Sequence, residues 1–264
     1  MANESKNDSM RKTLLVVFLL CLVCSVVVAG SAVSLREKQQ VQILLDKQRN
    51  ILDVAGLMTP RMPGNQVRET FAKYIETRLL DLNSGEFVPG DNSKFDLVAA
   101  LRSNTKSIEL PASDDIAGIR RRSNQVEIYL VRDDAGKVSN IILPVNGSGV
   151  WAMMYAFVAL DADGNTVRGL SFYRHGETPG LGGEIQNPHW RAQWIGKQLF
   201  DENGTPAIRI VKGGARPGDI HGVDGLSGAT LTSNAVQNTF NFWLGEHGFG
   251  PFLQRVREGA LKNG

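Results

Sequence analysis

The segment Asp224–Asn234 concentrates side chains that can take part in chemistry. It reads DGLSGATLTSN and contains one carboxylate, two glycines and four hydroxyls, without lysine, histidine or cysteine. A hydroxyl is a weak nucleophile that needs an adjacent base. The segment offers only Asp224, and His221 lies upstream of it. The pattern is therefore typical either of a structural turn or of a site on which another enzyme acts.

A helix is expected directly after this segment. Four apolar residues recur at helical spacing, namely Val236, Phe240, Trp243 and Leu244. Thr232 or Ser233 is expected to cap this helix, and Gly225 and Gly228 permit a tight loop before it. Free N–H groups and the helix dipole at such a start favour an anion such as phosphate.

Three functional interpretations compete with a simple capped turn. A P-loop requires a lysine that the segment lacks. A serine hydrolase would use Ser227 as nucleophile, because GLSGA differs from the nucleophile elbow G-x-S-x-G by one residue, with Glu246 and His247 downstream. However, RPGDIHGVD before Gly225 is not an apolar strand. The third interpretation is an acceptor for a covalent, phosphate-linked group.

DGLSGAT closely resembles the flavinylation motif D-x-x-[ST]-G-A-[TS] of the FMN-binding domains of the Nqr and Rnf respiratory complexes. The resemblance implies that the last hydroxyl of the motif, Thr230, carries FMN through a phosphoester. A flavin transferase of the ApbE type, with FAD as donor, would attach it. The same resemblance assigns cofactor contacts to the rest of the motif: Asp224, Gly225, Ser227, Gly228 and Ala229.

HGETPGLGGEIQNPHW, His175–Trp190, resembles the H-x-E-T-P-G-L-G loop of the same family. The resemblance implies that this loop lines the flavin site through His175, Glu177, Thr178, Gly180, Leu181 and Gly182. Backbone donors and glycines suit a flavin ring. A zinc site built from His175, Glu177 and His189 has no confirming spacing, so no metal is expected.

Four residues outside these two motifs are further candidates for the flavin site. Trp151 and Tyr155 either border the flavin or belong to the core. Lys212 and Arg216, just upstream of the motif, either balance the charge of the phosphate or belong to a solvated loop face.

The N-terminal region predicts a membrane anchor. Thr13–Leu35 contains no charged residue, and as a helix it would span about 35 Å, enough for a bilayer core. A signal peptide cleaved near Ala29-Gly30-Ser31 is the alternative. Cys21 and Cys24 lie inside this span. We interpret them as small apolar side chains rather than a redox pair or half of a metal site. Later residues include no cysteine, so the soluble part has no disulfide or cysteine-ligated cluster.

The remaining pattern predicts an α+β fold: one transmembrane helix, then a soluble domain with antiparallel β-hairpins and flanking helices. Expected strands are 126–131, 138–145, 151–160, 166–173 and 207–211. Expected helices are 36–57, one containing Val67, Phe71, Tyr74, Ile75 and Leu79, and one starting near Asn187. The expected division is a cytoplasmic N-terminus 1–12, a transmembrane helix 13–35, a helical stalk 36–60 and a periplasmic FMN-binding domain 61–264.

Composition limits the functional classes. The net charge of +2 argues against nucleic-acid binding, and an apolar content of 42% is enough for a folded core. No G-x-G-x-x-G follows a predicted strand, so this chain alone is not expected to bind NADH. The positive-inside rule favours neither orientation, since lysines and arginines flank the span on both sides: Lys6, Arg11, Lys12, Arg36, Lys38, Lys47 and Arg49.

The family resemblance implies an electron-relaying flavoprotein subunit, without independent catalysis, in a bacterial inner membrane. GLGGEIQNPHW and GVWAMMYAF are closer to the Nqr branch, a Na+-pumping NADH:quinone oxidoreductase, than to the paralogous protein of the Rnf complex, which transfers electrons between ferredoxin and NAD. The implied partners are the A, B, D, E and F subunits, and the soluble domain would lie in the periplasm as part of a single-pass protein.

Overall fold

The computed structural model describes residues 10–90 and 95–261. The chain divides into two compact units, Met1–Lys47 and Gln48–Gly264. Lys6 and most of the segment 1–12, expected to be cytoplasmic, lie outside the described residues.

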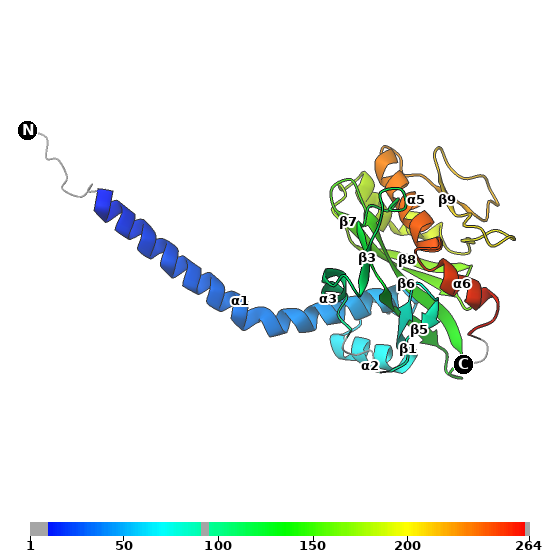
Figure 1. Ribbon diagram of the computed structural model, residues 1–264, viewed down its shortest axis with the longest axis horizontal. Coiled ribbons are helices and arrows are strands. Elements are labelled where there is room, and N and C mark those ends of the chain that lie inside the picture. The colour runs from blue at the N-terminus through cyan, green and yellow to red at the C-terminus, as the bar shows by residue number, and fades with distance from the viewer. Residues whose placement is uncertain (1–9, 91–94, 262–264) are drawn as a thin grey trace, which may run out of the picture. The chain divides into compact units, whose positions relative to one another are not determined.

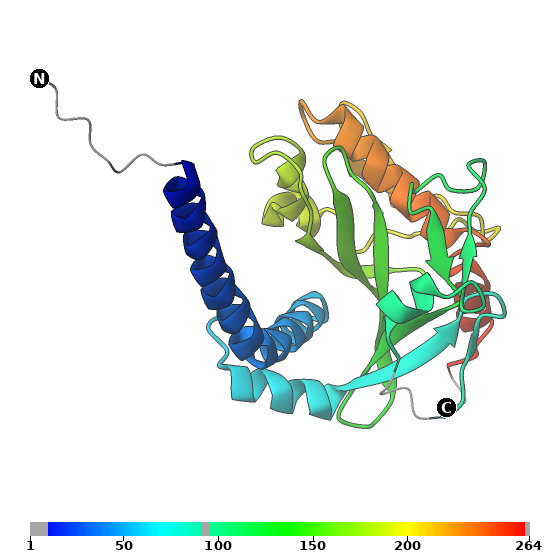
Figure 2. The ribbon, with the colours of Figure 1, turned by 60° about the vertical axis from the view of Figure 1, so that its left-hand side comes forward.

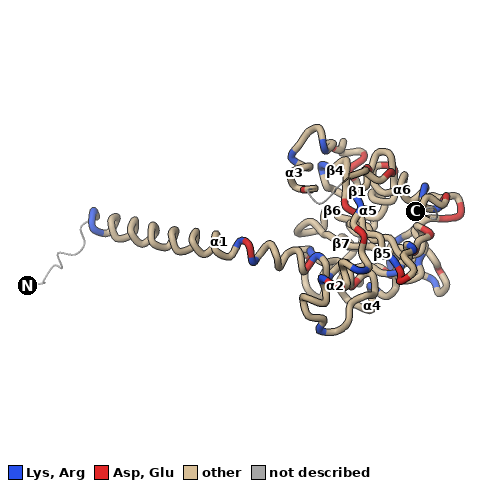
Figure 3. Tube along the Cα trace, turned by 90° about the horizontal axis from the view of Figure 1, so that it is seen from below, with Lys and Arg blue, Asp and Glu red and all other residues tan. Residues whose placement is uncertain are grey.

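Helix α1, Met10–Val54, provides the first unit and enters the second. It contains the apolar run, whose side chains are exposed, and it is the one helix in the described part of the chain that is long and apolar enough to cross a membrane. Figure 3 shows no charged residue on this helix between Lys12 and Arg36. Cys21 and Cys24 are free thiols on its exposed surface.

The second unit is built around a six-stranded antiparallel sheet with the order β2-β1-β5-β6-β7-β8. Its strands are β1 Ile75–Asp81, β2 Glu86–Phe87, β5 Gln125–Arg132, β6 Val138–Ser148, β7 Met153–Asp161 and β8 Val167–Arg174. The two predicted hairpins are confirmed as β5–β6 and β7–β8. The long β6–β7 pairing joins them, from Asn140 opposite Asp161 to Ser148 opposite Met153.

Helices α5, Thr230–Leu244, and α6, Gly250–Arg257, pack on one face of this sheet (Figures 1 and 2). The approach of α5 to β6 is very close, because a Cβ added at Gly147 would lie 2.0 Å from Thr239 Oγ1. The Trp243 indole donates a hydrogen bond of 2.8 Å to the Asn146 carbonyl. Glycine at position 147 therefore allows α5 to lie directly on the sheet.

The other face is covered by aromatic side chains and by α2, Gly64–Tyr74. Phe71 on α2 meets Tyr129 edge-on, Tyr129 meets Phe157, and Phe157 stacks on Tyr173 with ring centroids 4.7 Å apart. Burial on both faces of the central strands explains their nearly continuous apolar sequences.

One predicted boundary is wrong. Ile75 and Leu79 belong to β1 rather than to the helix that contains Val67. The whole of β1 pairs antiparallel with β5, from Ile75 opposite Val131 to Asp81 opposite Gln125. A spacing of four residues fits one face of a helix and equally the period of two of a strand. Tertiary pairing decided between them.

Shorter elements complete the unit. They are α3 Leu97–Arg102, β3 Ser107–Glu109, β4 Arg121–Ser123, the 3-10 helix η1 Gly182–Gln186, α4 Pro188–Ala192, β9 Arg209–Val211 and β10 Gly222–Asp224. The helix expected near Asn187 is confirmed as α4. Its N-cap is the Asn187 side chain, which accepts the His189 N–H at 2.9 Å.

Candidate functional site

The motif segment is positioned by a two-stranded parallel sheet. Strands β9 and β10 pair so that Asp224 lies opposite Val211, and the Gly225 N–H donates to the Val211 carbonyl at 2.8 Å. This pairing brings the turn after β9 beside the loop that leads into α5. A cavity of about 490 Å³ lies there, lined by Ile210, Lys212, Gly213, Gly214, Asp224, Gly225, Leu226, Ser227, Gly228, Thr230, Ser233 and Asn234.

The four hydroxyls of the segment fall into two classes. Thr232 and Ser233 are buried: Thr232 donates to Glu177 Oε2 at 2.5 Å, and Ser233 Oγ accepts the Leu226 N–H at 2.9 Å. Ser227 and Thr230 are exposed and line the cavity. Only these last two hydroxyls are open to a reagent from outside.

The predicted capping by Thr232 or Ser233 is wrong. Helix α5 begins at Thr230, its N-cap is Ala229, and no side chain caps it. Gly228, with φ of +73°, turns the chain into the helix earlier than the hydroxyl spacing predicted. Thr232 and Ser233 therefore lie within the first turn and bind other segments. The N–H groups at the start of α5 have no side-chain acceptor among the described residues.

Asp224 holds the motif in place. Its carboxylate accepts the Ala215 N–H at 2.7 Å, its own N–H donates to Gln193 Oε1 at 3.0 Å, and its carbonyl accepts the Trp190 indole N–H at 2.7 Å. These contacts fix the backbone just before Thr230. Asp224 thus acts in the turn as a structural hydrogen-bond acceptor.

The two cations proposed to balance a phosphate differ in position. Lys212 is exposed and lines the cavity that contains Thr230. Arg216 is exposed but does not line it. Of this pair, the structure brings only Lys212 to the motif.

The loop after β8 packs against the motif at Glu177 and Gly182. Glu177 is only 5% exposed and accepts both the Val150 N–H at 2.8 Å and the Thr232 hydroxyl. Gly182 is buried, and a Cβ there would lie 2.3 Å from Thr232 Oγ1. The Glu177 N–H donates to His175 Nδ1 at 3.1 Å, so His175 helps to shape the loop.

The tip of this loop is a tight turn that presents Leu181. The Thr178 carbonyl accepts the N–H groups of Leu181 and Gly183, at 3.1 and 2.9 Å, and Gly180 has a φ of +74°. The Leu181 side chain is 46% exposed, and its Cδ2 lies 3.3 Å from the Cβ that Gly228 lacks. The loop therefore places an apolar side chain directly beside the motif.

Trp151 and Tyr155 lie in different surroundings. Trp151, in the turn between β6 and β7, is 74% exposed and is not a core residue. Its neighbour Val150 is bound by Glu177, so this turn adjoins the loop. Tyr155 instead lines a separate cavity of about 230 Å³ with Tyr173. There, burial raises the pKa of the Tyr173 phenol to about 12; the nearby Tyr155 adds to this effect and Arg174 opposes it.

The geometry rejects a serine hydrolase. Ser227 precedes the start of α5, whereas His247 follows its end, and a helix of 15 residues is about 22 Å long. The His247 ring faces Asp114 at 3.5 Å and Glu246 at 3.7 Å. The described residues also contain no group of three or more side chains suited to hold a metal ion.

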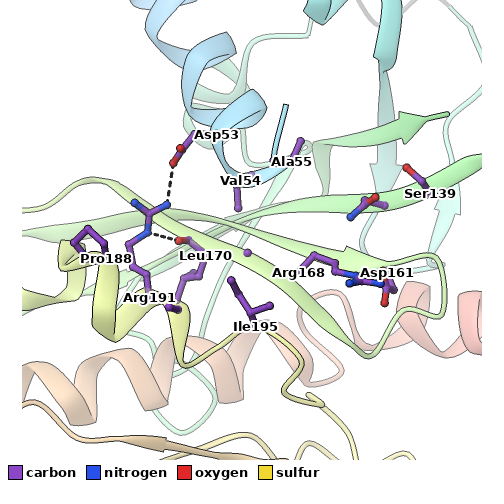
Figure 4. Close-up of a pocket in the computed structure, with 14 residues that line it drawn as sticks. Asp53, Val54, Ala55, Ser139, Asp161, Arg168, Leu170, Pro188, Arg191 and Ile195 are labelled. Atoms are coloured by element: carbon purple, nitrogen blue, oxygen red, sulfur yellow. Dashed lines mark hydrogen bonds and ion pairs between the residues drawn. The ribbon is translucent and has the colours of Figure 1, made fainter. Parts of the chain in front are cut away.

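A larger cavity of about 680 Å³ lies elsewhere in this unit and contains none of the predicted site residues (Figure 4). Its cations are paired within the protein. Arg191 binds Asp53 at 2.8 Å and donates to the Leu170 carbonyl at 2.6 Å, and Arg168 binds Asp161 at 2.5 Å. These pairs join neighbouring segments and leave little capacity to bind a ligand.

Sequence reasoning missed several residues of the site. Gly213, Gly214 and Asn234 line the motif cavity, and Trp190 and Gln193 fasten Asp224. The paired glycines directly after a predicted strand were the one available signal. The contacts to Asp224 depend on the tertiary fold.

Comparisons with known proteins agree with this location. The model of the FMN-binding domain family matches residues 149–245, which include the β6–β7 turn, the loop after β8 and the motif. The chain is 69% identical to NqrC, the C-type subunit of the Na(+)-translocating NADH-quinone reductase, from Yersinia pestis, over 98% of this chain and 97% of that protein. It is 56% identical to the corresponding protein of Vibrio anguillarum, over 97% and 99%.

Solved structures show the same fold. The crystal structure of Shewanella oneidensis NqrC matches with a TM-score of 0.74 and 41% identity, over 81% of this chain and 97% of that chain. The crystal structure of the corresponding protein of the Na(+)-translocating NADH-quinone reductase from Parabacteroides distasonis matches with a TM-score of 0.63 and 29% identity, over 83% and 96%.

Proposed function

The chain belongs to the NqrC family of the Na(+)-translocating NADH-quinone reductase, and we propose that its Thr230 hydroxyl carries FMN through a phosphoester bond. It is a subunit of this oxidoreductase, with an FMN-binding domain and one apolar N-terminal helix for membrane association. This identity favours the Nqr assembly over the Rnf complex.

The placement of Thr230 carries the proposal. Thr230 is the one hydroxyl of the segment that is exposed, lines the cavity and begins a helix. Ser227 shares the first two properties but precedes the helix. Thr232 and Ser233 are engaged in buried hydrogen bonds.

The residues present suit a flavin phosphate. The start of α5 offers N–H groups without a side-chain cap, and the helix dipole there favours negative charge. Lys212 adds a positive charge on the cavity wall. A cavity of about 490 Å³ lies within the usual size range of cofactor sites. Leu181 and Trp151 provide exposed apolar surface beside the motif.

The attachment requires a second enzyme. The Thr230 oxygen forms a bond to the FMN phosphorus of FAD, the phosphoanhydride bond breaks, and AMP leaves. A base on a flavin transferase of the ApbE type takes the hydroxyl proton, because Thr230 has no hydrogen-bonded base among the described residues. When bound, FMN supplies electron transfer. The chain holds its phosphate end, so the cofactor cannot dissociate between turnovers.

We further propose the arrangement in the cell. Residues 13–35 span the inner membrane once, 1–12 are cytoplasmic, 36–60 form a stalk and 61–264 lie in the periplasm. The A, B, D, E and F subunits of the reductase are the partners between which this protein relays electrons. The exposed apolar surface of 13–35 supports the span.

The test is covalent labelling of the full chain in cells that contain the flavin transferase. In-gel fluorescence after denaturation, together with the intact mass, reports attached FMN. The wild type and Ser227→Ala are expected to be labelled, and Thr230→Val unlabelled. A colourless wild type, or label retained in Thr230→Val, would refute the proposal.

A further inference from the structure

Glu177 is a buried carboxylate. It is 5% exposed, and Thr232, its hydroxyl partner, is 3% exposed. Oε1 accepts the Val150 N–H at 2.8 Å, and Oε2 accepts the Thr232 hydroxyl at 2.5 Å. The described residues place no cation in an ion pair with it. A carboxylate removed from water in this way depends on its hydrogen bonds, so both oxygens are committed to fixed donors.

The packing around Glu177 leaves no space for rearrangement. A Cβ at Gly149 would lie 2.4 Å from Oε1, and a Cβ at Gly182 would lie 2.7 Å from Oε2. Neither glycine has a positive φ, so glycine is needed here for space rather than for backbone conformation. Three segments thus converge on one carboxylate: the β6–β7 turn, the loop after β8 and the first turn of α5.

The bond to Thr232 acts on the helical turn that begins with Thr230. This turn has no side-chain cap, and uncapped first turns tend to fray. Two buried side-chain bonds hold it from different sides: Thr232 to Glu177, and Ser233 to the Leu226 N–H. The direction of the Thr230 hydroxyl therefore depends on the Glu177 bond.

We propose that Glu177 is a positioning residue that aligns the Thr230 hydroxyl for flavin transfer through its hydrogen bond to Thr232. The proposal rests on the proposed attachment at Thr230. Glu177 is not the base of the transfer, because its two oxygens are bound to Val150 and Thr232.

The test measures transfer of FMN from FAD to the purified full chain by a purified flavin transferase, with the chain as varied substrate. Thr232→Val removes the hydroxyl at nearly constant volume, and Thr232→Ser retains it. Glu177→Ala removes the acceptor, and Glu177→Gln retains a side chain that hydrogen-bonds both partners. Glu184→Gln in the same loop is the control, because the amide oxygen still accepts from Asn187.

The first member of each pair is expected to lower kcat about tenfold or more, with KM changed less than about twofold. The conservative member and Glu184→Gln are expected to stay within about threefold of the wild type. A structural role alone would not produce this split, because partial unfolding lowers the competent fraction regardless of which hydrogen bond is restored. Thermal unfolding of every variant checks that it is folded.

The outcomes separate the two proposals. An unlabelled wild type refutes the attachment itself. A labelled wild type with Thr232→Val equally fast, or with Thr232→Ser as slow as Thr232→Val, overturns the positioning role alone. If Glu177→Ala does not fold, the two Thr232 variants decide.

Discussion

The two large cavities of the soluble unit differ in what their polar groups do. The cavity near Arg191 is larger, about 680 Å³ against about 490 Å³, but its arginines bind Asp53, Asp161 and the Leu170 carbonyl. The motif cavity contains an exposed hydroxyl, an uncapped helix start and Lys212, which has no ion pair with another described residue. Free donors and an accessible nucleophile, rather than volume, distinguish a site from a crevice.

The sharpest test of this contrast uses one left-handed glycine from each cavity. Gly228 has a φ of +73° and Gly56 a φ of +72°, so Gly→Ala should destabilise each by about 1–2 kcal/mol. A Cβ at Gly228 would contact Leu181 beside Thr230, whereas a Cβ at Gly56 has no neighbour within 4 Å. Gly228→Ala should slow flavin attachment about tenfold or more, and Gly56→Ala should not change its rate.

Unfolding midpoints and labelling rates are measured on both variants. Equal slowing in the two would mean that attachment follows global stability, and the contrast between the cavities would fail.

A smaller effect is expected for the cation of the motif cavity. Lys212→Gln should raise the KM for flavin transfer about threefold at low ionic strength, and the difference should shrink as salt screens this exposed charge. Arg216→Gln is the matched control, since Arg216 is also exposed but does not line the cavity. The measurement is the initial labelling rate at low and high salt. Equal effects of both substitutions would assign the cation effect to net charge.

The smallest effect concerns acid stability beside the larger cavity. Burial raises the pKa of Asp163, but hydrogen bonds from Thr166 and Asn165 and the charge of Arg168 outweigh this and hold the pKa below 3.8. A lowered folded-state pKa adds stability above pH 3.8, and this stability is lost as pH falls through the folded-state value. Because the side chain is exposed, solvent screening limits the effect to less than about 1 kcal/mol.

Asp163→Asn should therefore lower the urea midpoint slightly near neutral pH and make its acid decline shallower, with flavin attachment unchanged. Parallel pH profiles for the variant and the wild type would contradict this assignment.

The sequence contained enough local signal to predict the hairpins and to distinguish Thr230. Alternating apolar residues flank DADGN and RDDAG, so β5 to β8 follow from period and turn chemistry. The Thr232–Glu177 contact was out of reach, because it joins residues 55 positions apart. The caps expected from Thr232 and Ser233 were wrong for the same reason. Their hydroxyls bind distant or looped segments, and sequence spacing carries no information about such partners.

Glycines show the same limit. Gly149 and Gly182 look like turn residues in the sequence, yet their φ angles are ordinary and their role is to admit Glu177 and Thr232. Strand β1 also escaped prediction, because its pairing with β5 overrode a helix-compatible spacing.

The short helix α4 has a consequence for how this family can vary in length. Trp190 binds the Asp224 carbonyl, and the adjacent Arg191 binds Asp53. One inserted residue before them would turn the helix by about 100° and exchange the directions of these side chains. The Asp201–Thr205 turn, closed by its own hydrogen bonds, can lengthen without such loss. Natural insertions are therefore expected in that turn and not between Gly183 and Trp190.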